Sequence, residues 1–203
     1  MLGAMPRNIP RSAAAVARTA PHQIRIIGGQ WKRTRLEVAD RPGLRPTPDR
    51  VRETLFNWLG QDLTGWRCVD AFAGTGALGL EAASRGAAEV LLVEAEGDLV
   101  DQLRAVARKL EATNVTVQRG NALNVLPTLA AASVDLVFLD PPFEADLFDK
   151  ALAAALPALA PQGYVYLEAP AEWNAEAVGR HGLGLLRHTR AGAVHGHLLQ
   201  RVA

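Results

Sequence analysis

The chain has few of the residues that identify secreted, membrane-spanning or hydrolytic proteins. It contains one cysteine, Cys68, so an internal disulfide is excluded and a reducing compartment such as the cytoplasm is expected. No run approaches the ~20 consecutive apolar residues of a membrane span, which predicts no membrane partner. The few serines lie outside any Gly-x-Ser-x-Gly elbow, so a hydrolase triad finds no support.

Charge is unevenly distributed along a chain whose net charge is only +1. Residues 1–53 hold eleven Lys or Arg against four acidic residues, which gives this segment +7 and the remainder −6. A basic segment on an acidic body is typical of a protein that binds a polyanion, most simply nucleic acid. A solvated basic arm is the alternative.

The first 21 residues are rich in Ala, Arg and Pro and contain no acid, which predicts a disordered basic tail. Their Arg-rich composition also matches an organelle transit peptide. Arg exceeds Lys throughout the chain, however, at 19 to 3, so the bias is not a local targeting signal.

A glycine loop, residues 71–79, joins two apolar runs and is the clearest motif. The first run ends on Asp70 and the second, after a predicted helix, is closed by Glu94, which describes one βαβ unit. Glycine at positions 74 and 76 permits positive φ and a close approach of the backbone to a ligand. Glu94 stands where a carboxylate can accept hydrogen bonds from both hydroxyls of a ribose. The unit therefore predicts a nucleotide-like pocket.

The spacing Gly74-x-Gly76-x-x-Gly79 fits a dinucleotide as well as S-adenosylmethionine. Asp70 would place a negative charge at the mouth of the loop, where it would repel a pyrophosphate and attract an ammonium and a sulfonium. We therefore favour the methyl donor over NAD or a purely structural turn. Asn121 follows a later strand, where its amide could read an adenine ring or simply make a turn. The candidate cofactor-binding residues are Asp70, Phe72, Gly74, Thr75, Gly76, Glu94, Asn121 and Ala122.

The second chemical motif is Asp140-Pro141-Pro142-Phe143, directly after the apolar run 134–139. The two prolines stiffen the backbone and remove two amide donors, so the Pro141 carbonyl can accept a hydrogen bond beside the Asp140 carboxylate. A planar exocyclic amino group that donates to both acceptors would turn its lone pair toward an electrophile, and Phe143 could stack on its ring. These four residues are the candidate catalytic site for methyl transfer to nitrogen.

The basic segment has its own predicted structure. Residues 23–38 predict a β-hairpin with a turn at Gly28-Gly29, and an aromatic among cations suits RNA, although a buried Trp31 is equally expected. Thr47 is predicted to cap a helix that begins at Pro48. The candidate RNA-binding residues are Arg25, Trp31, Lys32, Arg33, Arg35, Arg45, Thr47, Arg50 and Arg52.

Helices and strands alternate through the rest of the chain. Helices are expected over 98–112, 123–130 and 147–159, and strands over 115–118, 134–139 and 164–167, which predicts a doubly wound, mainly parallel α/β sheet closed by a terminal antiparallel pair. His195 and His197 share a strand face, but no third ligand lies nearby in the sequence, so no metal site is predicted.

Three motifs stand in a fixed order: Gly-Leu-Arg-Pro-Thr-x-Asp-Arg-Val-Arg-Glu (43–53), Asp-x-Phe-Ala-Gly-Thr-Gly-Ala-Leu-Gly-Leu-Glu-Ala (70–82) and Asp-Pro-Pro-Phe (140–143). In this order they resemble the bacterial 16S ribosomal RNA guanine-N2 methyltransferases, the RsmD family. The resemblance implies a class I (Rossmann-like) methyltransferase with a seven-stranded sheet and an N-terminal hairpin and helix extension. It also implies S-adenosylmethionine as donor and a guanine of 16S rRNA, in the 30S subunit or its assembly intermediate, as acceptor.

Residues 1–21 are expected to be a tail, 22–60 the RNA-contacting extension and 61–203 the methyltransferase domain. A monomer is expected because no extra apolar helix stripe is left over. The chain departs from the family pattern at Lys32-Arg33-Thr34, where a glycine is usual, and at Val106, where an asparagine is frequent. An amino methyltransferase acting on adenine or a protein amide, and a catalytically idle RNA-binding assembly protein, remain the alternatives.

Overall fold

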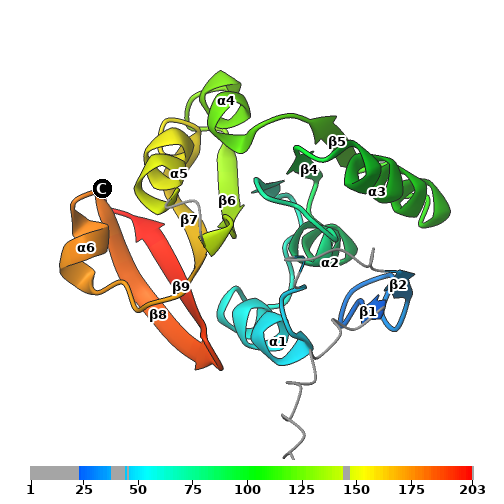
Figure 1. The fold of residues 1–203 in the computed structure, drawn as a ribbon, viewed down its shortest axis with the longest axis horizontal. Coiled ribbons are helices and arrows are strands. Elements are labelled where there is room, and N and C mark those ends of the chain that lie inside the picture. The colour runs from blue at the N-terminus through cyan, green and yellow to red at the C-terminus, as the bar shows by residue number, and fades with distance from the viewer. Residues whose placement is uncertain (1–22, 38–43, 45, 144–146, 203) are drawn as a thin grey trace, which may run out of the picture.

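In the computed structural model, one seven-stranded sheet forms the centre of the molecule and helices cover both of its faces (Figure 1). The structure describes residues 23–37, 44, 46–143 and 147–202. The predicted basic tail, residues 1–21, and the candidate RNA-binding residue Arg45 lie outside the described residues.

The sheet has the strand order β5-β4-β3-β6-β7-β9-β8. The first five strands in this order are parallel neighbours, whereas β9 runs antiparallel to both β7 and β8. This confirms the predicted doubly wound, mainly parallel sheet with a terminal antiparallel pair. The strands are β3 (Arg67–Asp70), β4 (Glu89–Glu94), β5 (Val115–Arg119), β6 (Val134–Leu139), β7 (Leu159–Ala169), β8 (Leu183–Ala191) and β9 (Val194–Arg201).

Two hydrophobic clusters fill the space between the sheet and its helices. Val51, Leu80 and Leu103 belong to the cluster on one face, and Val125 and Leu152 to the cluster on the other. The helices are α1 (Asp49–Trp58), α2 (Ala77–Ser84), α3 (Gly97–Lys109), α4 (Ala122–Val125), a 3₁₀ turn (Leu126–Thr128), α5 (Phe148–Ala155) and α6 (Ala175–Gly179). Among the described residues, none of these helices is long and apolar enough to cross a bilayer.

The N-terminal hairpin consists of β1 (Gln23–Arg25) and β2 (Arg35–Glu37), which pair antiparallel. Its turn is longer than expected, because backbone hydrogen bonds between Ile26 and Thr34 and between Arg33 and Ile26 close a nine-residue segment, 26–34. Gly29 has φ 73° within this segment, and a Cβ there would lie 1.8 Å from the Ser84 carbonyl oxygen. The glycine pair therefore allows the turn to rest directly on the end of α2.

Some element bounds differ from the sequence prediction for local reasons. Helix α1 begins at Asp49, and Pro48 rather than Thr47 occupies its N-cap position without a side-chain cap. Helix α5 stops at Ala155 with Leu156 as its C-cap, because Pro157 has no backbone N–H with which to continue the helical hydrogen-bond pattern. The expected turn near residues 161–163 is an irregularity inside β7, where the pairing with β6 shifts register.

Candidate active site at the carboxyl edge of the sheet

The strand order reverses at β3, which lies between β4 and β6, so the loops that follow these strands open at the same edge of the sheet. The glycine loop follows β3 and the Asp-Pro-Pro-Phe segment follows β6. The two motifs, which begin at residues 71 and 140, are therefore neighbours in space. The carboxylates at this edge belong to Asp70, Glu94, Asp140 and Glu168.

Glu94 holds the glycine loop in place. Its Oε2 accepts a hydrogen bond from the Gly74 backbone N–H at 2.8 Å, and its Oε1 accepts one from the Glu96 N–H at 2.9 Å. Each carboxylate oxygen has a further lone pair, so the half-buried Glu94 can still accept hydrogen bonds from ribose hydroxyls. The donor and acceptor chemistry of this loop thus fits the adenosine part of S-adenosylmethionine.

Both the backbone conformation and the nearby side chains favour glycine at positions 74 and 76. Gly74 has φ 51° and Gly76 has φ 76°, as the sequence predicted. A Cβ on Gly76 would lie 2.6 Å from Leu103 Cδ2, and one on Gly74 would lie 3.2 Å from Leu44 Cδ1. Leu44, from the segment before α1, therefore borders the loop.

Asp70 lies beneath the loop and not at its mouth. It is buried, and its Oδ2 accepts a hydrogen bond from the Gly79 N–H at 2.9 Å in the first turn of α2. Burial raises the pKa of Asp70 to about 7, with the charges of Glu94 and Glu168 adding to the rise and the Gly79 hydrogen bond opposing it. The expectation of a fixed negative charge at the mouth of the loop is therefore wrong, because the carboxyl group is buried and accepts its hydrogen bond from the start of α2.

Asn121 is the N-cap of α4, because its Oδ1 accepts a hydrogen bond from the Leu123 N–H at 2.9 Å. The side chain is exposed and its amide NH₂ carries two further donors. Of the other candidate cofactor residues, Phe72 and Thr75 are half-buried and Ala122 is buried.

The Asp-Pro-Pro-Phe segment presents a carboxyl group with an unusual proton affinity. Burial and the nearby charges of Glu168 and Asp70 raise the pKa of Asp140 well above its ordinary value. Phe143 is half-buried, and its ring centroid lies 6.2 Å from that of Phe148 in α5. Pro141 is buried and Pro142 is exposed.

Glu168, near the end of β7, is the site residue that the sequence reasoning missed. Its side chain is buried, its Oε1 accepts a hydrogen bond from the Tyr166 hydroxyl at 3.0 Å, and the Thr47 hydroxyl donates to the same carboxylate. The available signal was an acid inside the apolar run 164–169, since acids are rarely buried unless they have partners or a function.

The candidate RNA-binding residues divide into an exposed group and a buried group. The exposed side chains are those of Arg25, Lys32, Arg33, Arg35 and Arg50, and Trp31 is half-buried against the core. Thr47 and Arg52 are buried, so neither can contact RNA as predicted. Arg52 instead pairs with Glu81 at 3.1 Å and with Asp49 at 2.6 Å, and its Nε donates to the Thr47 carbonyl at 3.2 Å.

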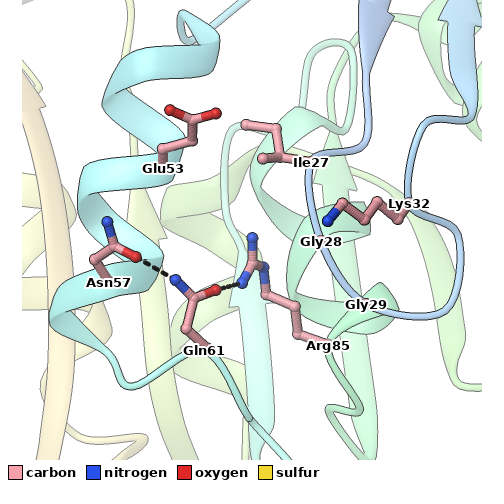
Figure 2. Close-up of a pocket in the computed structure, with 8 residues that line it drawn as sticks. All are labelled: Ile27, Gly28, Gly29, Lys32, Glu53, Asn57, Gln61 and Arg85. Atoms are coloured by element: carbon pink, nitrogen blue, oxygen red, sulfur yellow. Dashed lines mark hydrogen bonds between the residues drawn. The ribbon is translucent and has the colours of Figure 1, made fainter.

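A pocket of about 430 Å³ lies between the hairpin turn and α1 (Figure 2). The Lys32 side chain enters it from the hairpin, and Glu53 and Asn57 line it from α1. Gln61 accepts a hydrogen bond from Arg85 and donates one to Asn57. The remaining lining residues are Ile27, Gly28 and Gly29.

Comparison with known proteins connects these features to a family. The family model described as conserved hypothetical protein 95 matches residues 24–200. A relative from Escherichia coli strain K12, named ribosomal RNA small subunit methyltransferase D, is 43% identical over 183 residues, covering 89% of this chain and 91% of that protein. The chain belongs to the RsmD family.

Solved structures related to this RsmD family chain share its fold. A putative methyltransferase from Escherichia coli has a TM-score of 0.77 at 42% identity, and a putative methylase from Haemophilus influenzae has 0.74 at 31% identity. Each match covers 89% of this chain and 99% of the solved chain. The predicted class I methyltransferase fold is thereby confirmed.

This RsmD family member also brings three histidines together on β8 and β9. Ligand atoms of His188, His195 and His197 lie within 4.8 Å of one another, so the structure supplies the third imidazole that the sequence reasoning did not find. However, His197 accepts a hydrogen bond from the Trp173 N–H at Nε2, 2.9 Å away, and contacts the Leu167 carbonyl through Nδ1 at 3.2 Å. Both of its ring nitrogens are thus engaged by the backbone, which is typical of a structural histidine.

Proposed function

We propose that the protein transfers a methyl group from S-adenosylmethionine to the exocyclic N2 of a guanine in 16S rRNA. The observation that carries this proposal is the placement of Asp140-Pro141-Pro142-Phe143 beside the glycine loop, on adjacent strands of a class I methyltransferase sheet. The name of the Escherichia coli relative supports ribosomal RNA of the small subunit as the acceptor.

The cofactor would be held by the loop after β3 and by the ends of β4 and β5. Glu94 would accept the ribose hydroxyls, Gly74 and Gly76 would let the backbone approach, and Asn121 would offer its amide to the adenine. Bound there, the sulfonium supplies an electrophilic methyl group. Asp70 would contribute by fixing the start of α2 beneath the loop, with Phe72, Thr75 and Ala122 around it.

The substrate amino group would be oriented by the catalytic segment. The Asp140 carboxylate and the Pro141 carbonyl would each accept one N–H, which directs the nitrogen lone pair toward the methyl group. Phe143, packed on Phe148, would stack on the base. Most of the rate enhancement would then come from alignment and from placement of charge.

The exposed cations of the hairpin and Arg50 would bind RNA phosphates, and the pocket beside Lys32 would accept part of the RNA backbone. In this proposal residues 22–60 contact RNA and residues 61–203 carry the chemistry. We further propose that the protein acts as a cytoplasmic monomer on the 30S subunit or its assembly intermediate.

The deciding experiment transfers labelled methyl from S-adenosylmethionine to 30S particles and to free 16S rRNA from a strain that lacks the enzyme, followed by nucleoside mass spectrometry. We expect N2-methylguanosine, abolished in Asp140→Ala while donor binding persists. Asp149→Ala, which removes an exposed carboxylate of α5, is the matched control and should stay active.

Two outcomes would contradict the proposal. Label in N6-methyladenosine or in a protein amide would assign another amino acceptor. Donor binding without transfer to either RNA would favour an idle assembly protein.

A further inference from the structure

Asp140 directly follows β6, and Glu168 lies at the corresponding position on the neighbouring strand β7. Strands β6 and β7 pair in parallel with Leu139 opposite Leu167, so the next residues, Asp140 and Glu168, follow in the same register. Neighbouring strands lie about 4.8 Å apart, and paired residues point to the same face of the sheet. The two carboxyl groups are therefore placed to interact directly.

Given the proposed methyl transfer, on which this inference rests, we propose that Glu168 is a positioning residue that makes Asp140 a better acceptor for the proton released from the guanine amino group.

Glu168 is fixed from two directions. The Tyr166 hydroxyl, two residues earlier on the same strand and face, donates to its Oε1 at 3.0 Å. The Thr47 hydroxyl donates to it from the segment before α1, and the Thr47 carbonyl is in turn held by Arg52 Nε at 3.2 Å. A buried carboxylate with such partners can keep its position and its hydrogen bonds while its charge acts on a neighbour.

The charged groups around the pair are acidic. Asp70 acts on Asp140 from β3, Glu94 acts on Asp70 from β4, and β7 carries Tyr166 next to the pair as well as Tyr164. Arg52 reaches Thr47, but its carboxylate partners are Glu81 and Asp49. Among the described residues, no ion pair joins a cation to Asp140 or Glu168.

Burial and the charge of Glu168 are the two largest causes that raise the pKa of Asp140, and burial likewise raises the pKa of Glu168. Two carboxyl groups that interact this closely lose their protons in separate steps. The second proton is lost at a higher pH than Asp140 would lose its proton without a charged neighbour.

The chemistry requires such an acceptor. The N2 lone pair forms the new N–C bond and the S–C bonding pair stays with sulfur, so the nitrogen becomes cationic and must lose one proton. The Asp140 carboxylate, which accepts a hydrogen bond from that amino group, takes the proton, and the N–H pair returns to nitrogen. A more basic Asp140 favours this transfer.

The test is the Glu168→Gln variant, which keeps the size of the side chain and an acceptor for Tyr166 while removing the charge. We expect the acid limb of the pH profile of kcat to move to lower pH by about 1 unit. Carboxyl ¹³C NMR, measured without substrate, should show the titration of Asp140 moving in the same direction. Glu172→Gln, an exposed glutamate on the segment after β7, should leave both unchanged.

Glu168→Asp retains the charge and should keep the acid limb near that of the wild type, which separates the loss of charge from a change in packing. A loss of activity by the same factor at every pH, with an unmoved Asp140 titration, would overturn the inference and leave the proposed function intact. If the wild type fails to methylate rRNA, the proposed function fails, whereas the NMR titration still measures the coupling.

Discussion

Replacing Glu81 should cost the protein more stability than replacing any exposed acid. This carboxylate of α2 accepts hydrogen bonds from the backbone N–H groups of Ile27 and Gly28, at 2.9 and 2.7 Å. It also forms ion pairs with Arg52 at 3.1 Å and with Arg85 at 2.9 Å. Its side chain is fully buried, as is that of Arg52, and only 4% of the Arg85 side chain is exposed.

The expected loss follows from what Glu81→Gln would leave behind. Removing one partner of a buried ion pair costs about 3–5 kcal/mol, because the other charge stays buried without compensation. Here two guanidinium groups would lose their shared counter-ion, although Arg52 keeps Asp49 at 2.6 Å. Against the roughly 5–15 kcal/mol that stabilises a typical domain, this is a large fraction.

Urea unfolding followed by circular dichroism measures the effect as a shift of the midpoint at constant slope. Glu176→Gln, which breaks the exposed pair with Arg180 on α6, is the control and should leave the midpoint nearly unchanged. Because Glu81 also ties down the hairpin turn, limited trypsin digestion should cut faster at Lys32 or Arg33 in Glu81→Gln. A loss below about 1 kcal/mol, within the range of an ordinary substitution, would refute the reasoning.

Three further results are expected. Equilibrium RNA binding at several salt concentrations gives the slope of log affinity against log salt concentration, and Arg50→Ala should reduce this slope by about 1. Arg52→Met, at a buried position, should lower the stability of the protein and leave the slope unchanged. The pKa of Asp70 is raised from 3.8 to about 7 in the folded state, so its contribution to stability falls as pH rises from 3.8 to 7. In urea unfolding, the free energy of unfolding of the wild type should therefore exceed that of Asp70→Asn by more at pH 5 than at pH 8. Burial lowers the pKa of His197 from 6.5 to about 4, so its contribution to stability is present above pH 6.5 and is lost as pH falls toward 4. In thermal unfolding, the melting temperature of His197→Gln should therefore fall less between pH 6.5 and pH 4 than that of the wild type.

The fold could be predicted because its signals are local and repeated. The apolar run 134–139 predicts β6, and glycine at positions 74 and 76 predicts the positive φ that the structure shows at both. The proximity of the two chemical motifs was not predicted, because it depends on the pairing of β3 with β6. Pairing partners between distant segments were beyond the sequence. Nothing local to Arg52 indicates that Glu81, 29 residues later, would neutralise it inside the core.

The same limitation explains the two errors at the site. Asp70 looked like an exposed charge because its strand ends there, but the start of α2 folds back over it and supplies the Gly79 N–H. Thr47 looked like a helix cap, because a hydroxyl precedes a proline and an acid. Its hydroxyl is instead used by Glu168, which lies more than a hundred residues away in the sequence.

These corrections change the meaning of the motif at 43–53. Among its described residues, the exposed Arg50 remains available to RNA, while Thr47 and Arg52 connect the hairpin to the body of the protein. Arg52 donates to the Arg25 carbonyl in β1 at 2.9 Å and to Thr47, and Thr47 donates to Glu168 at the catalytic edge. These hydrogen bonds connect the hairpin to Glu168, the neighbour of the proposed proton acceptor Asp140. Replacing Thr47 or Arg52 is therefore expected to disturb the position of Glu168 as well as the packing of the N-terminal segment.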